Sequence, residues 1–390
     1  MNPPPEQELI ELVRGMRTVL LTRDEDAAND AKALAELIAG DRPTWTHVSP
    51  QVVDKILQDI RAGEVPDYVQ PSELFSQSEL FALPPLPSTE LTFKVLNYEL
   101  VGIHHAQGGL GSKGAYLVAL RKTPTSPLHV VVLKETHMGS PSEVFASEVM
   151  SKMGLCAPKL FPLTRKQFKD FTWKLRDARV TVDGTCGVLH SASAQEQGGM
   201  LMEFVRGTPL PECLGDEFDR SKGLLDDLGR TIALDIVLNC LDRTNVVWNH
   251  DGNPTNLLVG PTRLGVIDNT YNRIAEGELR TKHLDKIHQS SQTTAKLTVE
   301  GNEYIAAVGL FLTKSTAGRL VLSLQQLQQV VQAHHQTNIE LTQIGLKVFK
   351  ACQEDTQNKF EKSWGADKRQ LIANSLQLDF LETGLGMLVV

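Results

Sequence analysis

Four of the carboxylate- or amide-bearing side chains in the stretch "LDIVLNCLDRTNVVWNHDGNPTNLLVGPTRLGVIDN", residues 234–269, are placed where they could act together in chemistry. They belong to Asp242, Asn245, Asn256 and Asp268, and they flank short apolar runs. A buried strand disfavours carboxylates and amides at its ends unless these groups have a partner. Mg²⁺ prefers hard oxygen ligands of this kind, and an ion that carries nucleotide phosphates would use them. The stretch therefore predicts a site for magnesium and a nucleotide.

The order of these residues suggests a role for each. Asp242 follows a long apolar helix, where a carboxylate can orient the hydroxyl proton of a substrate, and Arg243 can steady the loop. Asn256 begins a short apolar strand and Asp268 ends the next one, so the two could hold the metal together. Asn245 is the competing amide, because it follows Asp242 closely in the same loop.

A glycine-rich segment, "HHAQGGLGSKGAYLV", stands between two predicted strands upstream. Glycines allow the backbone to approach a ligand and to present its amides to phosphates. The segment differs from the loop of P-loop NTPases, because it lacks the G-K-[ST] ending and leads into a strand. Its candidate phosphate-binding residues are Gly108, Gly109, Gly111, Ser112 and Gly114.

Lys134 closes the apolar run "HVVVLK" and needs either a counter-charge or water. The phosphates of ATP would supply that charge, as would Glu143 from the next predicted helix. Protein kinases use a strand lysine and a helix glutamate in this way. Glu143 also fits a capping box with Ser140, and Glu148 is the alternative partner for the lysine.

The run "GGMLMEFVRG" is interpreted as a buried strand that leads into a hinge between two lobes. Residues 202–205 could offer backbone hydrogen bonds to the adenine ring, with Glu203 and Val205 as the candidate binding positions. A plain core strand is the alternative interpretation of the same residues.

The order of elements predicts an α+β chain with a bilobal, protein-kinase-like fold that binds ATP between its lobes. Residues 1–63 have the apolar spacing of about three accessory helices. Residues 64–90 are a linker rich in proline and serine. Residues 91–205 contain strand-like runs and one helix, as expected of a small antiparallel-sheet lobe, whereas residues 206–390 are mostly helical.

Composition excludes several classes of protein. A net charge of −8 disfavours a nucleic-acid binder, which would usually carry a basic surplus. No apolar run approaches the roughly 18 residues of a membrane span, and the start of the sequence lacks the pattern of a signal peptide. The five cysteines lack metal-ligand spacing and are typical of free thiols in a reducing compartment. We therefore expect a cytoplasmic protein without a membrane-inserted segment.

Three stretches, "EVFASEVMSKMG", "LDRTNVVWNHDGNPTNLLV" and "LGVIDN", resemble the catalytic domain of the actin-fragmin kinase family, a distant relative of protein kinases and phosphoinositide kinases. The resemblance covers roughly residues 95–275 and is closest over residues 228–269. It implies a Ser/Thr protein kinase that uses ATP and Mg²⁺ and acts on actin or an actin-binding complex.

Carried over by position, the family pattern implies Lys134 and Glu143 for the nucleotide, Asp242 for catalysis, and Asn256 with Asp268 for the metal. The metal motif is I-D-N rather than D-F-G, and the absence of proline after Pro261 excludes an A-P-E segment. No repeat of the kelch length of about fifty residues is present.

The sequence is compatible with two other functions. One is a phosphoinositide or small-molecule kinase, although the basic residues after Asp268 alternate with acidic ones. The other is a pseudokinase scaffold, which the complete set of cleft charges disfavours.

Overall fold

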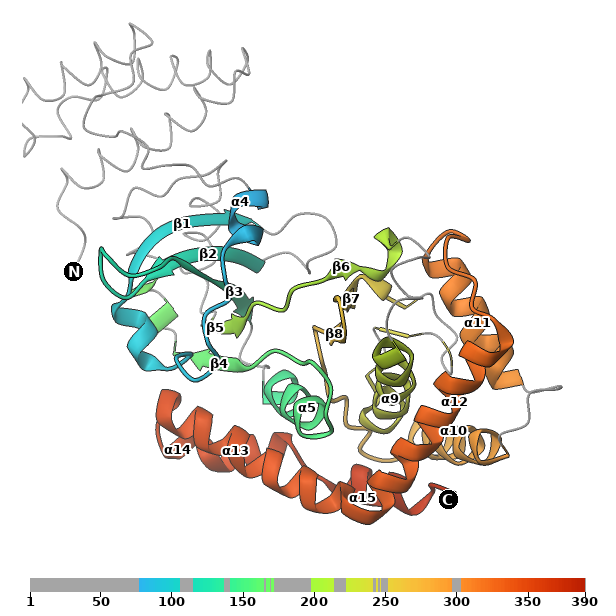
Figure 1. Cartoon of the computed structure of the whole chain (residues 1–390). Helices are drawn as coiled ribbons and strands as arrows, with labels where there is room; N and C mark the ends of the chain where they lie inside the picture. The colour runs from blue at the N-terminus through green and yellow to red at the C-terminus, as the bar shows by residue number, and fades with distance from the viewer. Residues whose placement is uncertain are drawn as a thin grey trace, which may run out of the picture.

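The computed structural model describes residues 77–105, 115–136, 141–164, 166–168, 170–171, 198–213, 222–240, 243–244, 246, 252–296 and 303–389. Its first structural unit is an antiparallel sheet of five strands in the order β1-β2-β3-β5-β4 (Figure 1). The strands are β1 (Glu99–His105), β2 (Ala115–Arg121), β3 (His129–Thr136), β4 (Leu160–Leu163) and β5 (Gly198–Glu203).

The centre of this sheet is buried on both faces, which explains why β2 is hydrophobic from Ala115 to Leu120 rather than alternating. On β2, Leu117 and Ala119 join the core that is shared with the helices, whereas Tyr116 and Val118 join a second core on the opposite face. Val131 of β3 lies in this second core. A strand covered on both sides needs apolar residues at every position.

Helix α5 (Pro141–Lys152) lies below this sheet in the view of Figure 1 and carries Glu143 in its first turn. Proline at the first helical position suits a helix start, because its missing N–H would have no partner there. The chain leaves the helix through Gly154, whose φ of 85° lies in the left-handed region that favours glycine.

The second structural unit is helical and holds a small antiparallel sheet in the order β6-β7-β8. Its central helix is α9 (Lys222–Leu238), predicted from the apolar run before Asn239. The strands are β6 (Thr208–Pro209), β7 (Leu257–Val259) and β8 (Leu264–Val266), with the short 3₁₀ turns η3 (Leu210–Glu212) and η4 (Pro254–Asn256). The peripheral helices are α10 (Glu278–Ala295), α11 (Glu303–Ser315) and α12 (Leu324–Glu340).

Helix α12 continues through a π-helical turn, η5 (Leu341–Gly345), directly into α13 (Leu346–Trp364). This long helix packs against α9 in its first part and against α5 in its second part. Gly345 marks a close approach, because a Cβ there would lie 3.0 Å from Leu385. Helices α14 (Asp367–Ser375) and α15 (Asp379–Gly386) complete the described chain (Figure 1).

The described part of the proposed linker, residues 77–90, is folded onto the sheet. Helix α4 (Gln77–Ala82) places Phe81 with its ring centroid 5.3 Å from that of Phe204. The chain then pairs with the start of β3, where Leu86 donates to the Val130 carbonyl at 3.0 Å. A 3₁₀ turn, η2 (Phe93–Asn97), connects this segment to β1.

The fold is therefore α+β, with a small antiparallel-sheet part and a larger helical part, consistent with the bilobal kinase-like fold expected from the sequence. None of the helices within the described ranges combines the length and the apolar character needed to cross a membrane.

Candidate active site

Lys134, Glu143 and Asp268 meet where the sheet faces the helical part of the chain. Lys134 lies on β3 between Ala115 of β2 and Met200 of β5. Its ammonium group donates to Oε1 of Glu143 at 2.8 Å and also contacts Oδ1 of Asp268. Because these residues come from a strand, a helix and the segment after β8, the cluster connects the two parts of the fold.

The structure distinguishes between the two glutamates considered as partners of Lys134. Glu143 occupies that position, whereas the carboxylate of Glu148 contacts Lys359 of α13. The side chain of Lys134 is 13% exposed and that of Glu143 is 10% exposed, so their ion pair is largely shielded from water. Such shielding strengthens the attraction but also makes any unpaired charge costly.

Burial affects the two members of this pair differently. Burial alone would lower the pKa of Lys134, but Glu143 and Asp268 outweigh it and hold the pKa above the usual lysine value. Desolvation raises the pKa of Glu143 to about 7, opposed by Lys134 and reinforced by the nearby charge of Asp268. Glu143 therefore exchanges its proton near neutral pH, whereas Lys134 stays charged.

This shift predicts a pH-dependent contribution of Glu143 to stability. The folded chain retains the Glu143 proton up to a pKa of about 7, whereas the unfolded chain loses it near 4.5. The stabilisation from this group is therefore fully present below the unfolded pKa and is lost as pH rises through the folded one. We expect the unfolding free energy of the wild type, relative to Glu143→Gln, to fall between about pH 5 and about pH 7.

Urea unfolding of both proteins across about pH 5 to about pH 8 measures this difference directly. Groups common to both chains cancel in the comparison. A difference that stays flat across the whole range contradicts the raised pKa of Glu143.

Asp268 has an unusual backbone conformation, with a φ of 56°. Among residues other than glycine, Asp and Asn enter this left-handed region most readily. The preceding residue, Ile267, donates its N–H to the carbonyl of Asn256 at 3.1 Å, and the paired strands β7 and β8 run on from there. Asn256 is fully buried beside the backbone that carries Asp268. The two candidate metal ligands are thus joined through their backbones.

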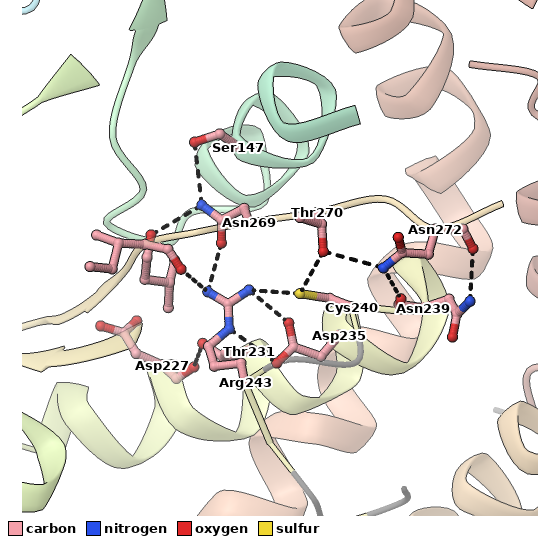
Figure 2. A network of polar contacts seen from close by, with 12 residues as sticks. Ser147, Asp227, Thr231, Asp235, Asn239, Cys240, Arg243, Asn269, Thr270 and Asn272 are labelled. Atoms are coloured by element: carbon pink, nitrogen blue, oxygen red, sulfur yellow. Dashed lines mark hydrogen bonds and ion pairs between the residues drawn. The ribbon is translucent and has the colours of Figure 1, made fainter. Parts of the chain in front are cut away.

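Arg243 is fully buried and its guanidinium is used entirely within the protein (Figure 2). It forms a bidentate pair with Asp235 of α9, at 2.9 Å to Oδ1 and 3.2 Å to Oδ2. Its other hydrogens go to Oδ1 of Asn269 at 2.6 Å, to the Ile267 carbonyl at 3.3 Å and to Sγ of Cys240 at 3.4 Å. A guanidinium has five N–H donors, and these five contacts account for all of them.

This network fixes the backbone on both sides of Asp268. Asn269 accepts from Arg243 and donates through Nδ2 to Oγ of Ser147 at 3.3 Å, and Ser147 lies on α5 (Figure 2). Arg243 thus acts through its neighbours, as expected of a group that steadies the loop, because it has no exposed surface for a substrate.

The sequence motifs do not single out Asp235, Asn269 or Ser147 as parts of the site. A signal for Asp235 was present: a carboxylate within the apolar helix segment "IALDIVL" requires a buried partner. Burial raises the pKa of Asp235 to about 6, opposed by Arg243, so this carboxylate is ionised at neutral pH.

A second buried carboxylate fixes the strands that carry the candidate ligands. Asp227 of α9 accepts from Nε of Arg263 at 2.7 Å and from the Leu264 N–H at 3.0 Å. These bonds attach the β7–β8 turn to the central helix and set the direction in which β8 approaches Asp268.

The candidate hinge lies against the same strands. A Cβ at Gly207 would be 2.8 Å from Cβ of Leu258, and a Cβ at Gly265 would be 2.5 Å from Val205, so glycine allows both approaches. Glu203 donates its N–H to the Lys159 carbonyl at 2.9 Å, and its carboxylate accepts from the Lys159 N–H at 3.2 Å. The N–H of Glu203 is therefore committed to the sheet, which leaves the backbone near Val205 as the better candidate for an adenine contact.

Several predicted site residues fall outside the described part of the chain. These are Asp242, Asn245 and the glycine segment Gly108, Gly109, Gly111, Ser112 and Gly114. The described strands still show where the glycine segment joins the sheet, because His105 pairs with Tyr116 and Ala115 pairs with Lys134. The segment therefore joins the sheet at the end that carries Lys134.

Comparison with known families agrees with this geometry. Residues 89–351 match the family described as actin-fragmin kinase, catalytic. The match spans more than half of the 390-residue chain. No curated protein sequence matches the chain significantly. The chain belongs to the actin-fragmin kinase catalytic family and is, by that membership, an ATP-dependent kinase.

Proposed function

We propose that the protein is a Ser/Thr protein kinase that transfers the γ-phosphoryl group of Mg-ATP to a protein hydroxyl. The observation that carries the proposal is the cluster of Lys134 with Glu143 and Asp268 between the two parts of the fold. The family description names actin, and actin or an actin-binding complex is accordingly the candidate acceptor. A cytoplasmic location would suit such a substrate and stays a prediction.

The charges in the cluster fit a nucleotide with its metal. Lys134 supplies the cation for the phosphates, and Glu143 holds the ammonium group in place. Asp268 and Asn256 supply the hard oxygen ligands for Mg²⁺, which when bound neutralises charge on the transferring phosphoryl group. We favour Asn256 over Asn245 because its carbonyl bonds directly to the residue before Asp268.

Asp242 is the proposed catalytic carboxylate. It stands between Cys240 and Arg243, both of which are fully buried and bonded to Asp235 or to each other. A loop anchored in this way can hold a carboxylate against the acceptor hydroxyl. Because the transition state of phosphoryl transfer is loose, the main contribution of such a carboxylate is to orient the acceptor hydroxyl.

The phosphoinositide alternative requires basic residues that are free to face an anionic membrane. Three of the basic residues after Asp268 are instead engaged with carboxylates. Arg273 and Arg280 both contact Asp379, at 3.0 and 2.6 Å. Lys282 contacts Glu278 at 2.6 Å. This neutralisation favours a protein acceptor over a lipid.

Incubation with labelled ATP and Mg²⁺ tests the proposal, with monomeric actin, phosphoinositide vesicles and cell extract offered separately. We expect label on actin or on another protein band. Asp242→Asn should reduce the transfer roughly a hundredfold or more while ATP binding is retained, because the carboxylate acts on the acceptor hydroxyl.

Label found in lipid alone would identify the lipid-kinase alternative. Binding of Mg-ATP without transfer to any acceptor would identify a scaffold. Equal transfer by the wild type and Asp242→Asn would exclude this residue as the catalytic carboxylate.

A further inference from the structure

The position of helix α5 decides whether Glu143 reaches Lys134, so the contacts that hold α5 control the ion pair. In protein kinases the corresponding helix is positioned by regulatory elements, among them the activation loop. This chain lacks proline beyond Pro261 and therefore has no A-P-E segment of the usual kind. The structure shows which other elements of the chain contact α5, among them α13, α9 and β4.

Helix α13 lies along α5 and reaches the edge of the sheet (Figure 1). Lys359 of α13 donates to the carboxylate of Glu148 on α5 and to the Leu160 carbonyl on β4 at 3.1 Å. A single ammonium group thus contacts both α5 and the sheet. The relative position of these two elements determines whether Glu143 meets Lys134.

Further polar contacts extend this connection in both directions. Lys152, at the end of α5, pairs with Asp355 of α13 at 2.6 Å. Ser363 of α13 donates to the Pro162 carbonyl of β4 at 2.8 Å. Because Lys152 and Asp355 are partly exposed, their pair contributes modestly to stability and mainly sets the register.

An apolar seam lies beneath these polar contacts. Phe145 of α5 and Phe349 of α13 are both fully buried, with ring centroids 6.4 Å apart. Cys352 and Phe360 continue the buried stripe along α13 at helical spacing. Phe145 also lies 5.3 Å from the ring of Tyr271, three residues after Asp268. The seam therefore packs against the two segments that carry the acidic members of the cluster.

We propose that α13 is a built-in brace that holds α5 in the position where Glu143 meets Lys134, with Lys359 as its main positioning residue. The family match ends at residue 351, and Asp355, Lys359 and Ser363 all lie beyond it. The proposal rests on the proposed role of Lys134 and Glu143 in binding ATP. It assigns to α13 a positioning role that the activation loop contributes to in protein kinases.

Steady-state kinetics of full-length Lys359→Met tests the brace. Methionine keeps the apolar stem and removes the charge, so α5 should spend less time in the position that binds ATP. Apparent affinity falls in proportion to the competent fraction, and we expect the KM for ATP to rise about five- to tenfold with kcat changed less than about twofold. Amide hydrogen exchange in α5 should also become faster in the absence of ATP.

Two matched variants control this experiment. Lys359→Arg keeps the charge and should restore the wild-type KM. Lys362→Met removes an exposed charge three residues further along the same helix and should leave the KM and the exchange of α5 unchanged. Glu148→Gln should raise the KM as Lys359→Met does, and the double variant should add little, because both remove the same contact.

Glu143→Gln separates failure of the brace from failure of the proposed function. If Glu143→Gln raises the KM for ATP and Lys359→Met does not, the brace is wrong and the proposed ATP site stands. A lower kcat at constant KM in Lys359→Met also rejects the brace, because it indicates loss of folded enzyme only. If neither variant changes the KM, the role of the Lys134–Glu143 pair in ATP binding is wrong as well.

Discussion

Asp268→Asn is expected to abolish magnesium-dependent transfer, with kcat/KM lowered about a thousandfold or more. The substitution removes the charge that would hold the metal and that contacts Lys134. Asparagine is the informative replacement, because it tolerates the φ of 56° at this position, whereas alanine would add backbone strain. The loss can then be attributed to the carboxylate rather than to a changed loop.

The measurement is Mg-ATP binding by calorimetry together with transfer at increasing Mg²⁺ concentration. We expect Asp268→Asn to lose the magnesium-dependent part of ATP binding, in contrast to Asp242→Asn, which should retain it. Asp285→Asn serves as the matched control, because Asp285 is exposed on α10, and it should behave as the wild type. More than about a tenth of wild-type transfer in Asp268→Asn would exclude this carboxylate as a metal ligand.

Arg243→Met is expected to lower the free energy of unfolding by about 3–5 kcal/mol. The variant leaves the carboxylate of Asp235 fully buried without its bidentate partner. It also leaves Asn269 and the Ile267 carbonyl without the donor that fixes them. A loss of this size is a large fraction of the roughly 5–15 kcal/mol that stabilises a typical folded protein.

Urea unfolding followed by circular dichroism measures this effect, and a second substitution identifies its cause. Asp235→Leu combined with Arg243→Met removes both charges and should recover part of the loss, because an apolar pair leaves no buried charge. Arg369→Met is the control, since it breaks a surface pair with Glu361 and should cost no more than about 1 kcal/mol. If Arg243→Met costs no more than this control, the buried network does not stabilise the site.

The ion pair of Lys134 and Glu143 could be inferred from the sequence, because the neighbours of each residue along the chain indicate its environment. Lys134 closes an apolar strand and Glu143 begins the next helix, so the sequence already contains a cation that needs a partner and a candidate close by. Contact between Lys134 and Asp268 across 134 residues could not be inferred, because local spacing does not state which distant strand ends meet.

The support around the site was harder to infer for a related reason. The apolar stripe over residues 320–353 predicts an amphipathic helix, and α12, η5 and α13 lie in this region. Apolar burial has no direction, so the stripe does not tell which helix it covers. The contact of Lys359 with Glu148 depends on that choice and is visible only in the folded chain.

The π-helical turn η5 has a consequence for changes in chain length. Successive residues of an α-helix are rotated by about 100°, whereas a π turn accommodates about one extra residue. The turn thus sets the angle between the face of α12 on α9 and the face of α13 on α5. Loss of one residue within Leu341–Gly345 would leave a regular helix with both faces in phase. Loss of one residue between Gly345 and Lys359 would instead rotate Lys359 by about 100° and turn its ammonium group away from Glu148. Natural variation in the length of this helix is therefore expected at η5.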